Sequence, residues 1–410
     1  MNCELNDRPL LFVLLFMMAG IFGGMVFLVS VVSTRTAFVV LFALLLVALF
    51  FRNRAVISTL LLLLSSFALG VVLISNSVDR GFQSTISFSA IDRVEEYMAD
   101  ERESLLKVYS DAGLSADEYG IIAAVTLGER NAVSRELKES YRVSGASHLF
   151  ALSGLHLSII FALLSVFLPT KMFPKSSAAV QILLLWTYVL LVGIYPSLLR
   201  AAVMFTCYCL CRLVSRESHN IDVLILTAFI LLVFNPQWLF DVGFQMSFMA
   251  MVGIFLLAPP MMKWVKTPVL SYVYGIFVVS FAASLGTFPL IAHYFGRVSC
   301  YGLLTNLIAS PCIALLLFCA FLMMLSAALQ PYIAFLSVVT HALSYILKYV
   351  VGFMNGAIHS IASLPGSSVS GVHISFAQVI LVYVLIVCVV LIACHVKHGI
   401  RLRLHGPDYN

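Results

Sequence analysis

Residues 302–327 read GLLTNLIASPCIALLLFCAFLMMLSA and contain no Asp, Glu, Lys or Arg. About 20 apolar residues are enough to cross the hydrocarbon core of a membrane as a helix. Similar runs recur along the 410 residues, of which 61% are hydrophobic and only 10% charged. An ordinary soluble domain carries roughly 25% charged residues. The composition therefore predicts an all-α fold, a polytopic bundle of transmembrane helices.

The apolar runs predict about twelve spans, some of them short or broken. The first run is too long for a signal peptide and lacks a small-residue cleavage site, so we expect a retained helix. Most of the cysteines lie inside the runs, where a free thiol behaves as a small hydrophobe. The spans are expected at about 9–32, 36–51, 55–75, 146–168, 177–194, 196–214, 220–235, 240–258, 269–289, 302–327, 332–354 and 374–396.

The basic residues predict how these spans are oriented. With the N-terminus in the cytoplasm, the inner loops hold four pairs of Lys or Arg, whereas the short outer loops hold only Arg35 and Arg297. The C-terminal tail adds three more basic residues on the inner side. An excess of Lys and Arg in cytoplasmic loops is the rule for membrane proteins. We therefore expect both termini in the cytoplasm.

One long loop, residues 76–145, falls on the outer side and holds eight Lys or Arg against thirteen Asp or Glu. Within it, residues 91–112 predict an amphipathic helix, either at the membrane surface or on the bundle, or else a solvated linker helix. Gly113 and Ser115 then indicate a helix end and a new N-cap. Residues 118–128 are apolar but too short to span, which predicts a re-entrant or interfacial segment. We divide the chain into a three-helix membrane unit (1–75), an acidic outer linker (76–118), a membrane channel domain (119–396) and a basic cytoplasmic tail (397–410).

Three polar residues interrupt the span expected at 146–168. A charged group at the centre of a membrane helix costs about 2.5 to 3.5 kcal/mol, so polar groups there usually face the bundle interior or a watery path. Ser153 and His156 are three residues apart and share a helix face, and His148 lies about 80° further round. All three side chains can therefore point broadly inward. Alternatively, they only hydrogen-bond neighbouring helices.

Pro-interrupted segments carry the next polar residues. Arg200 follows Pro196 near the outer start of a span, where it either snorkels to the surface or turns inward to an anion or a carboxylate. In NPQWLFDVGFQMSF (235–248), Asp241 and Gln245 share a helix face, and Asp241 either lines a path or caps the helix. Broken helices of this kind commonly line a cavity.

Together these stretches resemble the membrane domain of ComEC-type competence proteins. The most specific piece is GASHLFALSGLH (145–156), and the Arg-Ala-Ala and Gly-Phe-Gln-x-Ser elements strengthen the match. The pieces occur in the family's order over about residues 90–330. The resemblance implies an inner-membrane channel of a bacterium that passes single-stranded DNA into the cytoplasm during natural transformation.

The same resemblance implies which residues serve the channel. The DNA path would be lined by His148, Ser153, His156, Arg200, Asp241, Gln245 and Asn306. The structural positions of the motifs are Gly145, Ser147, Gly154, Pro196 and Gly243. Cations and hydrogen-bond donors suit the phosphates of a single strand, and flat rings suit its bases. No catalysis, metal or cofactor is expected.

Many relatives also carry an outer OB-like domain and a C-terminal metallo-β-lactamase-like nuclease domain. We expect neither in this sequence, so a separate DNA receptor, nuclease and cytoplasmic motor are expected as partners beside the lipid bilayer. Two other functions stay open. Ser153 could form an intramembrane hydrolase with His156, or with His293 from another span. Three residues apart on one helix is, however, poor geometry for Ser153 as nucleophile and His156 as its base. Arg200 and Asp241 could instead gate a small-molecule or lipid transporter.

Overall fold

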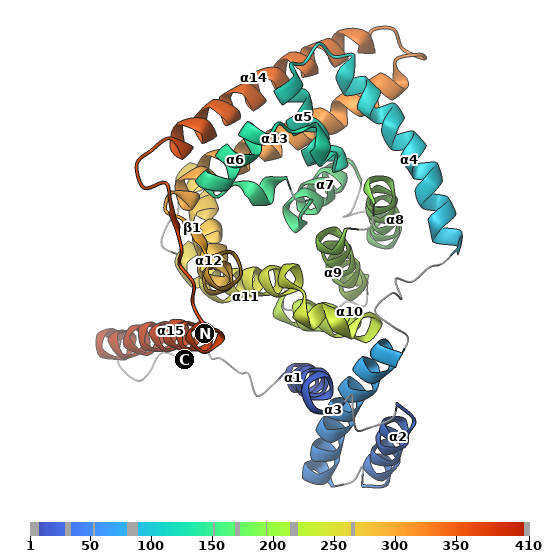
Figure 1. Ribbon diagram of the computed structural model, residues 1–410, viewed down its shortest axis with the longest axis vertical. Helices are drawn as coiled ribbons and strands as arrows, with labels where there is room; N and C mark the ends of the chain where they lie inside the picture. Colours follow the sequence, from blue (N-terminus) through green and yellow to red (C-terminus); the bar gives the residue numbers. More distant parts are fainter. Residues whose placement is uncertain are drawn as a thin grey trace.

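The computed structural model describes residues 8–28, 34–51, 54–79, 89–150, 152–168, 173–193, 195–213, 220–263 and 267–405. Over these ranges the chain is built of helices with one pair of very short strands (Figure 1). The elements are α1 (Pro9–Gly23), η2 (Gly24–Leu28), α2 (Thr34–Phe50), α3 (Ala55–Asp79), α4 (Ser89–Ser110), α5 (Ala116–Leu127), η3 (Arg130–Ala132), α6 (Arg135–Ser144), η4 (Ser147–Leu149), α7 (Gly154–Phe167), α8 (Pro174–Val192), α9 (Pro196–Leu213), α10 (Asn220–Phe234), η5 (Pro236–Phe240), α11 (Val242–Met262), α12 (Pro268–Phe295), β1 (Arg297–Ser299), α13 (Gly302–Leu329), α14 (Leu336–Ala362), β2 (Ser368–Ser370) and α15 (Phe376–His405).

The predicted all-α membrane architecture is confirmed. Among the described residues, seven helices are long and apolar enough to cross a membrane: α1, α3, α8, α11, α12, α13 and α14. Shorter apolar stretches, of 10–17 residues within the described part of the chain, lie in α2, α7, α9, α10 and α15, where the other spans were expected. The total of twelve spans stays a prediction, because these stretches are too short to establish a full crossing.

Closely packed glycines join α1 to α3. A Cβ on Gly20 would lie 2.0 Å from the backbone oxygen of Phe67, and one on Gly70 would lie 2.2 Å from that of Met17. Small residues let membrane helices approach until their backbones touch. The unit formed by α1, α2 and α3 contacts α10 and η5, and Arg8 pairs with Asp222 of α10 at 3.0 Å.

The main buried core surrounds α5. Residues 120–127 are all buried, and α5 contacts α4, α13 and α14. Its start is as predicted, because Ser115 and Glu118 form a reciprocal capping box. The burial of this short apolar helix places it inside the protein, and its depth in the membrane, re-entrant or interfacial, stays a prediction.

The described residues of the acidic loop, 76–79 and 89–145, are largely helical, and they pack on the bundle. The expected amphipathic helix forms as α4 and lies against α8 and α5, with Tyr109 fully buried. Of the three placements considered for it, packing on the bundle is the one observed. A further helix, α6, lies against α14 and was not predicted. Its ten residues are mostly polar, and its signals were the Ser134 N-cap and the glycine at Gly145.

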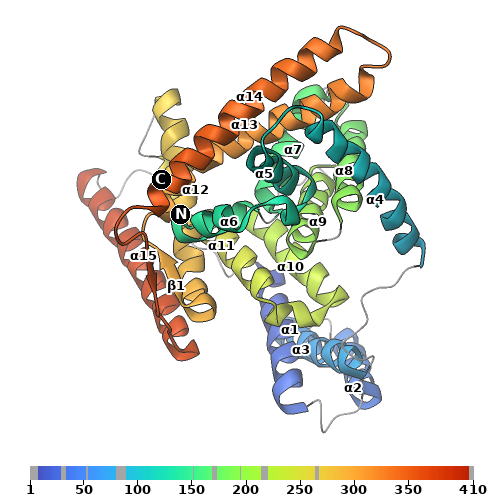
Figure 2. The same cartoon turned by 45° about the horizontal axis from the view of Figure 1, so that its top comes forward.

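A two-stranded sheet joins the loop between α12 and α13 to the loop between α14 and α15 (Figure 2). β1 pairs antiparallel with β2, with Val298 opposite Val369. Tyr301 donates a hydrogen bond to the carbonyl of Pro365, and Arg297 pairs with Glu139 at 3.4 Å. The Arg142 guanidinium, hydrogen-bonded to Glu139, lowers the pKa of that carboxyl. All of these contacts join segments that the basic-residue pattern places on the outer side.

Candidate functional site

The start of α7 holds the Ser-His pair. Ser153 is the N-cap, with extended backbone angles of φ −127° and ψ 173°. Its backbone N–H donates to Nδ1 of His156 at 3.2 Å, and its Oγ lies 2.9 Å from the same nitrogen. Because Nδ1 accepts a hydrogen bond, the proton of the neutral ring is on Nε2. His156 is fully buried and its Nε2 has no partner in the described part of the chain, so it presents an unused donor.

His148 lies in a different element from that pair, the short helix η4. The expected helix over 146–168 begins only at Gly154, because the extended Ser153 interrupts it, and His148 is in η4. Its ring is exposed, and Nδ1 lies 3.1 Å from the Gly145 carbonyl. The expectation that His148 shares one helix with His156 is therefore wrong. The two imidazoles still lie close enough to interact electrostatically, and a place for His148 on a DNA path stays a prediction. Ser147, its neighbour, is exposed as well.

Arg200 and Asp241 come together although 41 positions separate them in the sequence. Arg200 is only 7% exposed, and its Nη1 lies 3.9 Å from Asp241 Oδ1. The same Oδ1 accepts the Phe244 N–H at 2.7 Å, so Asp241 caps α11, one of the two roles predicted for it. Arg200 turns inward to a carboxylate and does not snorkel. Its Nε is buried and has no partner within the described residues.

Gln245 and Asn306 differ in how fully they are hydrogen-bonded. Gln245 donates to the Leu239 carbonyl at 2.9 Å and accepts from the Tyr294 hydroxyl at 2.8 Å, so both ends of its amide are occupied. Asn306, near the start of α13, has a buried Oδ1 for which the described residues supply no donor. Tyr294 was not among the predicted residues, although it lies in the Pro-interrupted stretch TFPLIAHYFGRVS (287–299).

The motif glycines and proline set how the helices meet. Gly145 ends α6 with φ +86°, and a Cβ there would lie 2.8 Å from the Cβ of Ser299. A Cβ on Gly154 would lie 3.7 Å from that of Ala201, so α7 passes close to α9. Pro196 is the first residue of α9, a position where proline's missing N–H costs nothing.

The helices that carry these residues gather at one end. The first turns of α7, α9 and α11 contact one another through Gly154 with Ala201 and Arg200 with Asp241. The start of α13 joins them through α6, because Thr305 donates to the Ser144 carbonyl at 2.9 Å. α7 packs against both α9 and α13 (Figure 1). Helix N-termini carry a partial positive charge and free N–H groups, which favour anions.

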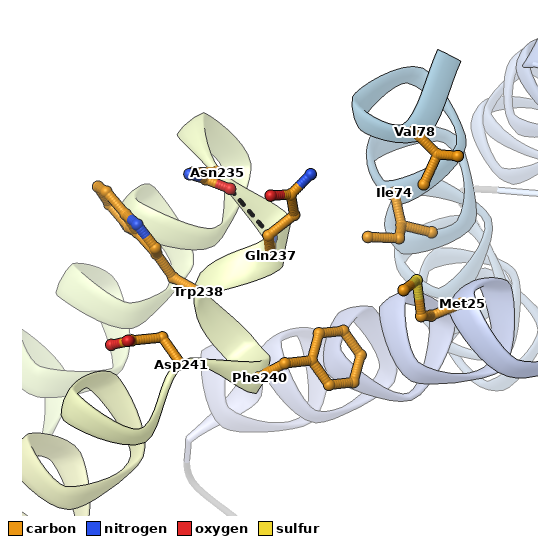
Figure 3. Close-up of a pocket in the computed structure, with 8 residues that line it drawn as sticks. All are labelled: Met25, Ile74, Val78, Asn235, Gln237, Trp238, Phe240 and Asp241. Carbon is orange, nitrogen blue, oxygen red and sulfur yellow. Dashed lines mark hydrogen bonds between the residues drawn. The ribbon is translucent and has the colours of Figure 1, made fainter. Parts of the chain in front are cut away.

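A pocket of about 370 Å³ lies beside Asp241, between η5 on one side and η2 and α3 on the other (Figure 3). Gln237 and Phe240 face Ile74, Val78 and Met25 across it, and Gln237 also donates to Ser77 Oγ at 2.8 Å. Sequence reasoning did not predict this pocket, because it forms only where two separate parts of the chain meet.

The comparisons with known proteins bear on this same part of the chain. A family model described as Competence protein matches residues 125–395. ComE operon protein 3 of Bacillus subtilis is 33% identical over 204 residues, which are 50% of this chain and 26% of that protein. An uncharacterized protein of Mycoplasma genitalium is 32% identical over 173 residues, 42% of each chain. Recombination protein 2 of Haemophilus influenzae is 23% identical over 273 residues, 58% of this chain and 34% of that protein. The chain thus spans less than half the length of these relatives, and no solved structure matches it.

Proposed function

The chain belongs to the Competence protein family, and from this premise we propose that it is an inner-membrane channel that passes single-stranded DNA into the cytoplasm during natural transformation. The family match covers the helices that carry the polar residues described above, from α7 to α13. Because the chain spans only part of each relative's length, the family match alone does not carry over a relative's activity. DNA transport by this chain is therefore itself part of the proposal.

One observation carries the proposal. Seven buried side-chain polar atoms have no partner among the described residues, and three of them are His156 Nε2, Arg200 Nε and Asn306 Oδ1. A buried polar group without a hydrogen bond costs about 1 to 3 kcal/mol, so such groups are rare unless a ligand or water uses them. All three lie within the first five residues of α7, α9 and α13, the helix ends that gather together.

The chemistry of these groups suits a single strand. Phosphates are met by Arg200, by the Nε2–H of His156 and by the amide-rich starts of the helices. The acceptor on Asn306 can take an N–H from a base. We further propose that both chain termini are cytoplasmic and that a separate receptor, nuclease and motor work with this chain.

Deletion of the gene from a naturally transformable host tests the proposal. We expect labelled DNA to reach the cell surface but not the cytoplasm. Complementation with His156→Gln or Arg200→Gln should lower cytoplasmic DNA about tenfold, the scale of losing one charge-assisted hydrogen bond. The matched controls are the variants His359→Gln and Arg135→Gln, which change exposed residues of the same types. Complementation with either control variant should restore uptake fully. Normal uptake in the deletion strain would overturn the proposal.

The contact between Ser153 and His156 gives one observation in favour of a hydrolase. It forms because Ser153 lies outside α7 as its N-cap, a placement that the spacing argument did not consider. However, Nδ1 of His156 already accepts a backbone N–H, and no carboxylate orients the ring within the described residues. A hydrolase predicts that Ser153→Cys retains activity and Ser153→Ala has none, whereas a channel predicts nearly equal DNA uptake for both variants.

A further inference from the structure

We propose that Arg200 and the first turn of α11 form a discrete binding site for one phosphate-type oxyanion, and that the Asp241 carboxylate holds this site until the anion displaces it. The inference rests on the proposed function in one respect: there, the oxyanion is a phosphodiester of the passing strand. Three features of the described residues carry it.

The first feature is the start of α11. This helix runs for 21 residues, so its N-terminus carries the full positive end of a helix dipole. Asp241 Oδ1 accepts the Phe244 N–H, and the Asp241 carbonyl accepts the Gln245 N–H. The N–H groups of Val242 and Gly243 have no partner within the part of the chain that the structure describes. Two adjacent free amides at a helix start are suited to an anion.

The second feature is the guanidinium of Arg200, which is buried and faces this turn. Its Nη2 and Nη1 lie 3.7 and 3.9 Å from the position that a Cβ on Gly243 would take. Its side chain is 8% exposed, and Nε has no partner among the described residues. A guanidinium presents five donors in a planar fork that matches phosphate oxygens. The two terminal nitrogens face the helix start, and Nη1 is also the atom that pairs with Asp241.

The third feature is space. Gly243 is exposed, and a side chain there would sit 3.2 Å from Asp241 Oδ1 and directly in front of the guanidinium. Because Gly243 has no side chain, an anion can approach both the backbone amides of this turn and the Arg200 guanidinium. Glycine is the residue that allows a ligand to approach backbone so closely.

In the absence of an anion, the Asp241 carboxylate supplies the negative charge beside Arg200. At 3.9 Å its contact with Arg200 is an ion pair longer than a charge-assisted hydrogen bond, which is typically about 2.7 to 2.9 Å. A buried guanidinium needs a counter-charge, and the Asp241 carboxylate supplies it. The carboxylate is 44% exposed, so it can swing toward solvent when a phosphate takes its place.

The test is phosphate binding by the purified full chain in detergent. Thermal unfolding is followed while sodium phosphate is titrated against sodium chloride of equal ionic strength. We expect a saturable rise in Tm with phosphate, because a ligand that binds only the folded state stabilises it. Arg200→Gln and Gly243→Ala should abolish the rise, and Arg200→Lys should weaken it because ammonium lacks the planar fork.

Asp241→Asn separates this site from a purely structural ion pair. The asparagine oxygen still caps α11, but the competing charge is gone. We therefore expect phosphate affinity to rise about tenfold. Unchanged or weaker phosphate affinity in Asp241→Asn, or no phosphate response in the wild-type chain, would overturn the inference.

Two further arms identify the natural source of the oxyanion. A short single-stranded oligodeoxynucleotide should compete with phosphate, and phosphatidylglycerol in mixed micelles should not. Competition by the lipid alone would assign the site to a headgroup and overturn the phosphodiester assignment. Because phosphate binding is measured without transport, its loss would leave the uptake result of the proposed function standing, and the reverse also holds.

Discussion

Gly145 shows how one residue joins three segments. Its φ of +86° ends α6, its carbonyl lies 3.1 Å from His148 Nδ1, and its missing Cβ admits Ser299 of β1. Any side chain at position 145 would therefore cost free energy in two ways, through the left-handed backbone and through the steric contact with Ser299. The motif glycine therefore allows the end of α6 to pack against β1 of the two-stranded sheet.

We predict that Gly145→Ala lowers Tm more than Gly113→Ala. Both glycines have a positive φ, of +86° and +68°, but a Cβ on Gly113 meets nothing within 4 Å. Each substitution costs about 1 to 2 kcal/mol for the left-handed conformation, and only Gly145→Ala adds the steric contact. Adding Ser299→Gly to Gly145→Ala should recover the difference. Equal losses of Tm for the two single variants would show that the contact with Ser299 carries no cost.

At the scale of elements, glycine contacts determine which helices pack most tightly. A Cβ on Gly253 of α11 would lie 2.4 Å from the Ala282 oxygen, and one on Gly286 of α12 would lie 2.3 Å from the Met249 oxygen. The two helices therefore cross with backbone in contact, as α1 and α3 do. This crossing holds the start of α11, with Asp241, at a set distance from the end of α12, where Tyr294 bonds Gln245.

We predict that Gly286→Ala destabilises the folded chain by roughly 1 to 3 kcal/mol, the usual cost of overpacking. The control is Gly352→Ala in α14, where a Cβ meets nothing within 4 Å and alanine favours the helix. The measurement is the unfolding midpoint in detergent for each variant. A Gly286→Ala midpoint equal to that of Gly352→Ala would contradict the backbone contact.

At the scale of the whole molecule, contacts between loops agree with the predicted alternation of the spans. The end of α3 contacts η5 through Ser77 and Gln237, and both are expected outside. Arg8 contacts Asp222, and both are expected inside. These pairings fix which ends share a side, and the positive-inside rule adds which side that is.

Thiol labelling tests the absolute orientation. In a variant that keeps Cys300 and lacks the other eight cysteines, we expect a membrane-impermeant maleimide to label intact cells, because Cys300 is exposed in the loop before α13. The same background with Lys263→Cys in place of Cys300 should label only after permeabilisation. Labelling in the opposite order would invert the predicted topology.

The positions of the elements follow from local sequence to a large extent. The span expected at 220–235 is α10 at Asn220–Phe234, since an uninterrupted apolar run has only one stable conformation in a membrane. The start of α7 was predicted eight residues too early. The apolar run continues through Ser153, and only the structure shows that Ser153 is extended and caps a helix that begins at Gly154. α6 was missed because a short polar helix leaves no apolar periodicity.

By itself, the sequence determined that this chain is a helical membrane protein, where most of its helices lie, and which rare polar residues interrupt them. Apolar length and charge cost act locally, so they can be read along the chain. Only the tertiary structure decided that Arg200 pairs with Asp241, that Tyr294 donates a hydrogen bond to Gln245, and that His148 lies in a separate short helix from His156. Those relations depend on which helix ends touch, and glycine contacts between distant helices, such as Gly253 with Ala282, set that packing.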